Sequence, residues 1–287
     1  MGGKFWKLGI IGWPLGYSLS PKMHTAALKA AGLEGEYKEY KVKPEELEGW
    51  LETEAPKLDG FNVTMPHKEA VFRWLECAGK LGKPEQIACI RAVNTVKMEG
   101  DHLTGWDTDG EGFLAPFSDV MDLTDRRVLL LGAGGAARAI AISLASVAKI
   151  RTLKVWNRHA VKAEELAGLV DDLRVSCETR AVEDLSDPET GAVDLLVNAT
   201  PMGMSGKEGM PQEVLSHLRA GQMVCDIVYD PRETKLVREA RKRGCRVITG
   251  DRMLVAQGAV AFEIWSGVPA ARVLPAMRKA LDEHFAA

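Results

Sequence analysis

A lysine that follows a short polar strand is the residue of this sequence best suited to proton transfer. Asn62 and Thr64 are two residues apart on a predicted strand, so their side chains face the same way. Lys68 begins the next predicted helix, which brings an amide, a hydroxyl and an amine toward one place. That combination suits a polyhydroxylated substrate and a proton transfer, although a lysine in such a place is usually just solvated.

A glycine-rich turn supplies a second chemical feature. It follows an apolar strand directly and opens an Ala/Ile-rich helix, and its residues are Gly132, Ala133, Gly134, Gly135 and Ala136. Glycines allow a tight turn and let backbone N–H groups approach a pyrophosphate at the helix N-terminus. Methyltransferases use a similar turn, so the turn alone leaves the cofactor open.

The end of the next strand distinguishes between cofactors. An NAD site usually has an acidic residue there, which holds the ribose hydroxyls. This strand ends instead in Asn157 and Arg158, and an arginine can pair with the 2′-phosphate of NADP. The missing acid also counts against S-adenosylmethionine, so we expect NADP.

The elements that position these residues indicate an α/β fold with two domains. The chain up to residue 108 reads as strands at 8–12, 37–42 and 61–64, a hairpin at 92–97 and 102–106, and helices at 21–31, 44–51 and after Pro66. Ser20 is the expected N-cap of the first helix and Gly32 its stop. Apolar strands at 127–131, 153–156, 193–197, 223–228 and 245–248, with helices to about 148 and at 161–169 and 232–243, predict a parallel sheet.

This pattern predicts three segments. Residues 1–108 form a substrate-binding and catalytic domain, residues 109–249 a Rossmann-type NADP-binding domain, and residues 250–287 two helices that return to the first domain. The two final helices are separated near 267–269.

Composition excludes several classes of protein. A net charge of −3 does not suit a nucleic-acid binder. The five cysteines have no metal-ligand spacing, no apolar stretch is long enough to span a membrane, and the N-terminus lacks the apolar core of a signal peptide. The segment around Ser18 is not a GxSxG elbow, which argues against a hydrolase. We therefore expect a cytoplasmic enzyme without a metal, acting on a small molecule.

A series of segments, in order along the chain, resembles the shikimate dehydrogenase family. They include Ser-x-Ser-Pro, Asn-Val-Thr-x-Pro-x-Lys and Ala-x-Asn-Thr motifs, and their positions are 18–24, 62–68, 92–95, 105–110, 132–137, 157–158, 198–204, 226–231 and 250–257. The resemblance covers nearly the whole chain. It implies reversible NADP-dependent reduction of 3-dehydroshikimate to shikimate, in the shikimate pathway of aromatic amino acid biosynthesis.

The resemblance also implies roles for individual residues. Lys68 and Asp109 are the implied catalytic pair, with Lys68 as acid/base. The implied substrate contacts are Ser18, Ser20, Asn62, Thr64, Lys68, Asn94, Asp109, Tyr229 and Gln257. The implied cofactor contacts are Gly132, Ala133, Gly134, Gly135, Ala136, Asn157, Arg158, Ala199, Thr200, Met204, Ile227 and Gly250.

The sequence departs from the family pattern at five positions. Thr25 and Asp107 stand where asparagine is usual, Arg91 where glycine is usual, and His159 and Lys162 where threonine and arginine are usual. The last two soften the selectivity for NADP by removing one hydroxyl and one guanidinium. Lys162 keeps the positive charge, so NADP is still expected to be preferred. Asp107 adds a charge near Asp109, which could alter the pKa of that carboxyl.

Alternative functions remain open at this point. A dehydrogenase that acts on quinate or on both acids, or that uses NAD, would differ little in sequence. A methylene-tetrahydrofolate dehydrogenase shares the architecture but lacks the Ser-x-Ser-Pro and final glutamine segments. A non-catalytic NADP-binding sensor would not need Lys68 and Asp109. A homodimer is compatible with all of them.

Overall fold

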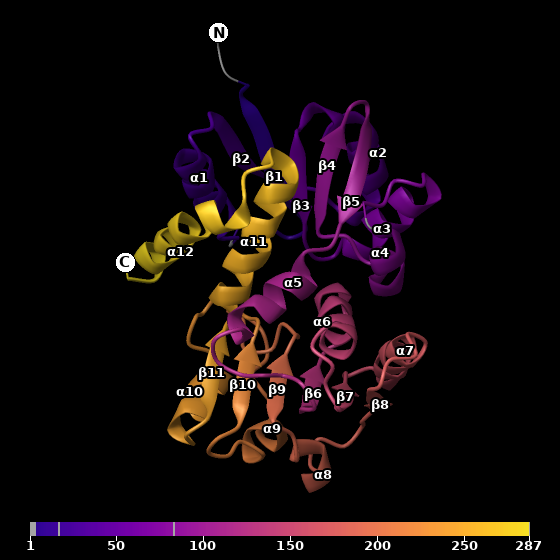
Figure 1. The fold of residues 1–287 in the computed structure, drawn as a ribbon, viewed down its shortest axis with the longest axis vertical. Helices are drawn as coiled ribbons and strands as arrows, with labels where there is room; N and C mark the ends of the chain where they lie inside the picture. Colours follow the sequence, from indigo (N-terminus) through magenta and orange to yellow (C-terminus); the bar gives the residue numbers. More distant parts are fainter. Residues whose placement is uncertain (1–3, 17, 83, 287) are drawn as a thin grey trace. The chain divides into compact units, whose positions relative to one another are not determined.

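The computed structural model describes residues 4–16, 18–82 and 84–286, which fall into two compact units (Figure 1). Unit 1 comprises Met1–Gly112 and Val255–Ala287, and unit 2 comprises Phe113–Leu254. The boundaries between the units therefore follow a few residues after the positions 108 and 249 that the sequence suggested.

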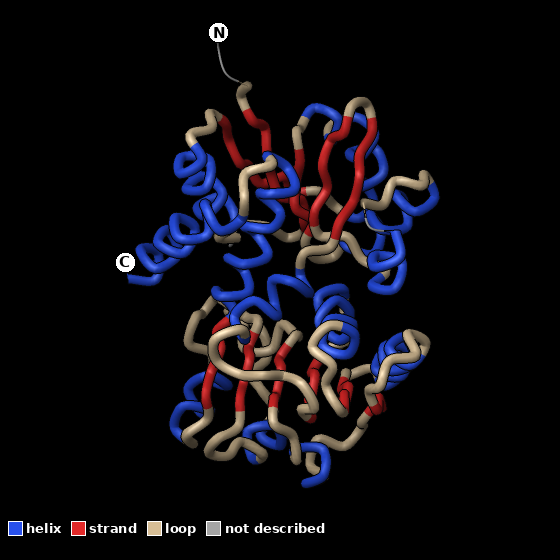
Figure 2. Tube along the Cα trace, viewed as in Figure 1, coloured by secondary structure: helices blue, strands red, loops and turns tan. Residues whose placement is uncertain are grey.

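Unit 1 contains a mixed five-stranded sheet. Its strands are β1 (Trp6–Gly12), β2 (Gly35–Lys41), β3 (Gly60–Val63), β4 (Thr95–Glu99) and β5 (His102–Trp106), in the order β2-β1-β3-β4-β5. The first three strands run parallel, and β4 and β5 form the predicted antiparallel hairpin. Apolar residues on both faces of this sheet are covered by helices (Figure 2), and Phe61 is among the fully buried side chains.

The helices of unit 1 include the C-terminal pair. They are α1 (Ser20–Ala31), α2 (Leu47–Thr53), α3 (Lys68–Cys77), α4 (Pro84–Ile90), α5 (Asp109–Leu114), α11 (Gly250–Ser266) and α12 (Ala270–Ala286), with 3-10 turns at Pro44–Glu46 and Ala55–Lys57. A third 3-10 turn, Ala115–Phe117, belongs to unit 2. The α5 and α11 helices each cross a unit boundary. Helix α12 packs along α1, where Lys22 Nζ lies 2.7 Å from His284 Nδ1. In α11, the Trp265 indole donates a hydrogen bond to the carbonyl oxygen of Val96 at 2.9 Å.

The prediction for the start of α1 is wrong by one residue. Leu19 occupies the N-cap position without a side-chain cap, and Ser20 is already the first helical residue. Pro21 is thereby at the second helical position, where its missing N–H costs no intrahelical hydrogen bond. The predicted stop is confirmed, because Gly32 has φ 71° and its N–H bonds the carbonyl oxygens of Leu28 and Lys29.

Unit 2 contains a fully parallel six-stranded sheet. Its strands are β6 (Arg127–Leu131), β7 (Thr152–Trp156), β8 (Glu178–Ala181), β9 (Leu195–Asn198), β10 (Met223–Asp226) and β11 (Arg246–Thr249), in the order β11-β10-β9-β6-β7-β8. The strand order reverses between β6 and β9. This is the order of a Rossmann fold, in which ligands bind outside the carboxyl ends of the strands at the reversal.

The helices of unit 2 connect these strands. They are α6 (Gly135–Ser146), α7 (Ala160–Asp171), α8 (Pro188–Gly191), α9 (Gln212–Ser216) and α10 (Lys235–Lys242). Strand residues such as Leu129 and Leu130 are completely buried, one in each of two apolar clusters. The predicted α/β class with a Rossmann-type parallel sheet is thus confirmed.

Candidate active site

Lys68 and Asp109 form a buried ion pair in unit 1. Each is the first residue of a helix, Lys68 of α3 and Asp109 of α5. The Lys68 ammonium donates a hydrogen bond to Asp109 Oδ2, and the side chains are 18% and 6% exposed. Both charges have largely lost their hydration, so each depends on the other for compensation.

The surroundings of Lys68 favour its charged form. Burial lowers the pKa of the Lys68 ammonium. The charge of Asp109, the charge that Asp107 carries when it is ionised, and the hydrogen bond to Asp109 together outweigh burial and raise the pKa above its usual value. Lys68 is therefore protonated at neutral pH, which is the state that can donate a proton.

Asn94 joins the other side of the Asp109 carboxyl. Its Nδ2 lies 2.7 Å from Asp109 Oδ1 and 3.0 Å from Thr108 Oγ, and its Oδ1 accepts the Thr108 N–H at 3.0 Å. Asn94 and Thr108 are both buried. Asp109 is thus held by one charged and one neutral donor, which fix its orientation.

Gln257 extends this network from helix α11. Its Oε1 lies 3.4 Å from Thr108 Oγ and 3.5 Å from Asn94 Nδ2. Gly112 makes this approach feasible, because a Cβ there would lie 2.4 Å from the Cβ of Gln257. We call Lys68, Asn94, Thr108, Asp109 and Gln257 the polar network. Thr108 was missed in the sequence, although it directly precedes Asp109.

Asn62 lies behind the polar network. Its Oδ1 accepts the Tyr37 hydroxyl at 2.7 Å, and its Nδ2 lies 3.2 Å from both the Asn94 carbonyl oxygen and Thr95 Oγ. Asn62 is buried, so in this structure it supports the Asn94 segment. Thr64 is half-buried and contacts the backbone at Gly12. Substrate contacts from Asn62 and Thr64 remain predictions.

The serine segment at the start of α1 is a compact turn. Ser18 Oγ accepts the N–H of Ser20 at 3.2 Å, and Ser20 is buried. His24, one turn further along, stacks on Tyr37 with ring centroids 4.4 Å apart. Burial lowers the pKa of His24 to about 3, so this histidine is neutral and not placed to activate a serine.

The glycine turn of unit 2 lies where the strand order reverses. The N–H of Gly132 bonds the Trp156 carbonyl oxygen at 2.7 Å, and the N–H of Ala199 bonds the Leu131 carbonyl oxygen at 2.8 Å. Gly132 has φ +116°, and a Cβ there would lie 2.8 Å from the carbonyl oxygen of Ala199. The turn therefore requires glycine at this position.

The same turn leaves the start of helix α6 open. Gly134 is its N-cap, and a Cβ at Gly134 would meet no atom within 4 Å. Ala133 is buried, while Gly135 and Ala136 begin the helix and are half-buried. Backbone N–H groups at an open helix N-terminus fit the pyrophosphate of a dinucleotide.

Arg158 follows β7 with an exposed side chain. Its guanidinium lies 3.6 Å from the Glu208 carboxylate, and the two side chains are 75% and 81% exposed. An ion pair this exposed is weak, so a phosphate can displace Glu208. Asn157 Nδ2 bonds the His159 carbonyl oxygen at 3.1 Å, and no acidic residue ends the strand. These residues fit NADP.

Asp226, which was not singled out in the sequence, connects the loops after β9 and β10. Its Oδ1 accepts Asn198 Nδ2 at 2.9 Å and the Val228 N–H at 3.1 Å, and its Oδ2 accepts the Thr234 hydroxyl at 2.6 Å. Burial raises the pKa of Asp226 to about 6 despite these three donors. Asp226 thus positions the segments that hold the remaining predicted cofactor residues.

Those remaining residues form close backbone contacts in unit 2. Thr200 Oγ donates to Asn198 Oδ1 at 2.6 Å, and the Ile227 N–H bonds the Asn198 carbonyl oxygen at 3.0 Å. A Cβ at Gly250 would lie 2.3 Å from the Ile227 carbonyl oxygen, so glycine is needed there for packing. Met204 and Tyr229 are half-buried in the loops after β9 and β10, and Tyr229 therefore belongs to unit 2.

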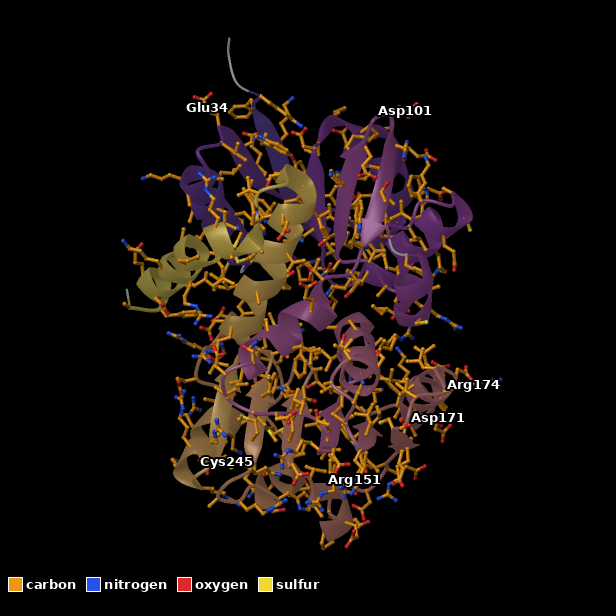
Figure 3. The ribbon with its side chains drawn as sticks, in the orientation of Figure 1. Glu34, Asp101, Arg151, Asp171, Arg174 and Cys245 are labelled. Atoms are coloured by element: carbon orange, nitrogen blue, oxygen red, sulfur yellow. The ribbon has the colours of Figure 1, made fainter. Side chains whose placement is uncertain are left out.

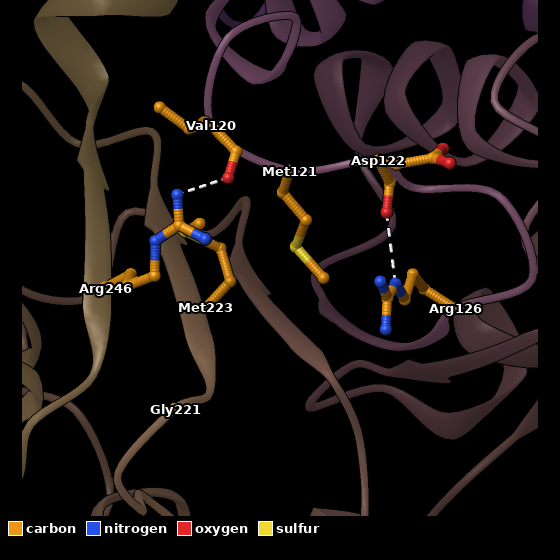
Figure 4. A pocket seen from close by; sticks show the side chains of 7 residues that line it. All are labelled: Val120, Met121, Asp122, Arg126, Gly221, Met223 and Arg246. Carbon is orange, nitrogen blue, oxygen red and sulfur yellow. Dashed lines mark hydrogen bonds between the residues drawn. The ribbon is translucent and has the colours of Figure 1, made fainter.

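A cavity of about 300 Å³ lies at the opposite edge of the same sheet (Figure 4). Met223 and Arg246, which line it, are the first residues of β10 and β11. Arg151 and Cys245 mark this amino-terminal edge in Figure 3. The guanidinium of Arg246 donates to the Val120 carbonyl oxygen, and Arg126 Nε donates to that of Asp122 at 3.0 Å. This cavity is thus distinct from the carboxyl-terminal edge of the sheet, where the glycine turn and Arg158 lie and which we call the nucleotide edge.

The described part of the chain lacks two further kinds of feature, a metal site and a membrane span. There, no group of three or more acidic, histidine or cysteine side chains is arranged to hold a metal ion. Over the same residues, no helix combines the length and apolar character that a membrane span requires.

Comparison with known proteins assigns the chain to a family. The family model described as the shikimate dehydrogenase substrate binding domain matches residues 10–96, and that of the shikimate 5′-dehydrogenase C-terminal domain matches residues 252–281. The shikimate dehydrogenase (NADP(+)) of Methanopyrus kandleri is 40% identical over 285 residues, which cover 97% of this chain and 95% of the relative.

Solved structures agree with this assignment. The shikimate 5-dehydrogenase of Thermus thermophilus in complex with NADP(H) and shikimate has a TM-score of 0.81 at 34% identity, covering 96% of this chain and all of that one. The 5-ketofructose reductase of Gluconobacter sp. strain CHM43 has a TM-score of 0.81 at 32% identity, covering 97% and 99%. The fold is thus shared by enzymes with different substrates, whereas sequence and fold together show that the chain belongs to the shikimate dehydrogenase family.

Proposed function

We propose that this chain is an NADP-dependent shikimate dehydrogenase, which reversibly reduces 3-dehydroshikimate to shikimate in chorismate biosynthesis. The observation that carries the proposal is the Lys68–Asp109 pair, buried and joined to Asn94 and Gln257 in a member of this family. A protein that only binds NADP would have no need to bury an ion pair beside so many polar groups.

The proposed reaction consumes one hydride and one proton. When bound, NADPH supplies the hydride to the carbonyl carbon of the substrate. Lys68 donates its proton to the carbonyl oxygen, which becomes the hydroxyl, and water restores the ammonium. In the reverse direction, a neutral Lys68 would accept the proton of the substrate hydroxyl.

The partners of Lys68 determine its protonation state and therefore which direction of the reaction it favours. Its raised pKa keeps the amine protonated at neutral pH, which favours the reduction of the ketone. Asp109 holds the ammonium in place and accepts part of its charge.

The other polar residues are proposed to orient the substrate. Ser18 and Ser20 would bind its carboxylate, while the ring hydroxyls would contact Asn62, Thr64, Asn94, Asp109, Tyr229 and Gln257. Hydroxyl and amide groups suit this task because each can both donate and accept hydrogen bonds.

The glycine turn and Arg158 are proposed to bind NADP. The backbone from Gly132 to Ala136 would hold the pyrophosphate, and Asn157 and Arg158 the 2′-phosphate. Ala199, Thr200, Met204, Ile227 and Gly250 would line the rest of the nucleotide.

Use of NAD as a second cofactor is a specific alternative. Glu208 competes for Arg158, and His159 and Lys162 replace residues that usually strengthen the phosphate site. Quinate differs from shikimate only around the ring, and none of the residues described above distinguishes the two acids. The family assignment sets aside a methylene-tetrahydrofolate dehydrogenase.

One assay separates these alternatives. NADPH absorbance is followed after mixing the protein and NADP with shikimate, with quinate or with no substrate, and the series is repeated with NAD. We expect fastest reduction of NADP with shikimate. Faster turnover of quinate would overturn the substrate, faster use of NAD would overturn the cofactor, and NADP binding without any turnover would indicate a sensor.

We also propose that the protein works in the cytoplasm, because Cys77, Cys89, Cys177, Cys225 and Cys245 are all free thiols. Its proposed partners are small molecules, with no nucleic acid or membrane. A homodimer remains a prediction, which light scattering on the purified protein tests.

A further inference from the structure

Asp107 stands where the family pattern has asparagine, and one of its hydrogen bonds could equally be made by an amide. Its Oδ1 accepts the N–H of Asp109 at 3.0 Å, which caps the first residue of helix α5. An asparagine oxygen could accept the same hydrogen bond. The cap therefore explains why an oxygen is needed here, but not why the residue can carry a charge.

The second carboxyl oxygen of Asp107 has no hydrogen-bond donor among the described residues. This oxygen, Oδ2, is also buried. The neighbouring Asp109 carboxylate already engages both Lys68 and Asn94. One lysine thus serves two adjacent carboxyl groups, and an anionic oxygen without a donor in a buried place is costly.

We propose that Asp107 is a neutral, protonated carboxyl group in the working enzyme, where it acts as a positioning residue in place of an amide. A buried carboxyl group beside a neighbouring carboxylate keeps its proton when it lacks donors that would stabilise its charge. Burial and the charge of Asp109 hold the pKa of Asp107 well above its usual range, against the opposing effects of Lys68 and of the amides of Asp109 and Gly110.

The other groups that face Asp107 do not replace the missing donor. Asp107 lines a cavity of about 300 Å³. The other residues that line it are Ile87 from α4, Trp106 from β5, Thr108, Glu111 from α5, and Val260, Glu263 and Ile264 from α11. The two glutamates are exposed, so solvent screens their charges, and both are acidic. The charge of Lys68 lowers the pKa of Asp107, but burial and the charge of Asp109 raise it by more.

The proposal has a consequence for stability that does not involve catalysis. A carboxyl whose pKa is raised by folding stabilises the protein most at pH values below its unfolded pKa, and this contribution is lost as pH rises through the folded pKa. In the Asp107→Asn variant, the amide would keep the cap and would not ionise. The stability of Asp107→Asn relative to the wild type should therefore increase with pH.

Thermal unfolding of the wild type and Asp107→Asn, measured from pH 5 to pH 9, tests this first. We expect the melting temperature of the variant minus that of the wild type to increase by about 2 °C or more from pH 5 to pH 9. Asp107→Ser, which keeps a capping oxygen without an ionisable group, should show the same trend. Glu111→Gln, on helix α5 but exposed, is the matched control and should show none. A difference that does not change with pH, or that falls as pH rises, overturns the proposal.

The second test rests on the proposed function. Above the pKa of Asp107, the new negative charge raises the pKa of Lys68, so the wild type keeps its proton donor to higher pH than the variant. For reduction of 3-dehydroshikimate, we expect the alkaline limb of kcat in Asp107→Asn to move down by about half a pH unit or more. If kcat depends on pH in the same way in the wild type and in Asp107→Asn, the charge of Asp107 does not raise the pKa of Lys68. A lack of turnover at every pH would contradict the proposed function and leave the unfolding result as it stands.

Discussion

The candidate catalytic residues and the candidate cofactor residues are built in different ways. In unit 1, the buried side chains of Asn94 and Asp109 and the partly buried side chain of Lys68 already bond one another. In unit 2, the nucleotide edge consists of backbone turns, open space at Gly134 and the exposed guanidinium of Arg158. The first arrangement preorganises charges for chemistry, whereas the second supplies a shape and a surface charge for binding.

This difference separates the expected kinetic effects. Changes in the polar network should lower kcat, because its interactions act on the reacting groups. Changes at the nucleotide edge should alter the KM for the cofactor and the choice between cofactors.

Asp109→Asn should have the largest effect among the residues around Lys68. The amide keeps the hydrogen bond from Asn94 but removes the charge that holds the Lys68 ammonium, so we expect kcat to fall by about 10²- to 10³-fold. The alkaline limb of ketone reduction should also move to lower pH, because Asp109 no longer raises the pKa of Lys68. Steady-state kinetics against pH measure both. An unchanged kcat would show that the pair is only structural.

Arg158→Ala tests the nucleotide edge. Loss of a charge-assisted contact to the 2′-phosphate should raise the KM for NADP by about 10- to 100-fold, with little change in kcat or in the KM for NAD. Comparison of NADP and NAD in the same assay provides the control. An equal loss with both cofactors would contradict a 2′-phosphate contact and indicate a disturbed loop.

Asp226→Asn tests whether unit 2 also contains a buried carboxyl group whose pKa is raised by folding. The pKa of Asp226 is raised to about 6, so its contribution to stability is fully present at low pH and is lost as pH rises through 6. The free energy of unfolding of the variant should gain about 2 kcal/mol on the wild type between pH 4 and pH 7. Denaturant unfolding measures this difference, and a constant difference would mean that Asp226 is not titrating in this range.

Glu208→Gln should have the smallest effect. It removes an exposed competitor for Arg158, so NADP should bind about two- to threefold more tightly while NAD is unaffected. Binding titrations with both nucleotides measure the change. Glu213→Gln, an exposed glutamate on α9, is the control, and weaker binding of NADP to Glu208→Gln would contradict the assigned competition.

The sequence predicted the regular elements better than the interactions among them. The strands of unit 2 with continuous apolar residues, such as 127–131, were placed within a few residues. Strand β8 was missed because Glu-Thr-Arg-Ala at 178–181 alternates exposure at the edge of the sheet and has no apolar run. Helix α10 begins at Lys235 with Thr234 as its cap, later than the predicted start at 232.

The polar network could not have been derived from local sequence. Lys68 and Asp109 are 41 residues apart, and Gln257 reaches Thr108 across 149 residues. Local chemistry suggested Lys68, but only the family resemblance paired it with Asp109 and selected Gln257. The resemblance did not select Thr108. The protonation state of Lys68 also required the structure, because burial and the neighbouring carboxylates act in opposite directions.

The central claim is that Lys68 transfers the proton, and the kinetics of Lys68→Ala with shikimate and NADP test it most directly. We expect kcat to fall by about 10³-fold or more, with the KM for shikimate within about threefold of the wild type, because the lysine acts in the transition state. If kcat stays within about tenfold, worth roughly 1.4 kcal/mol, Lys68 is not the acid/base.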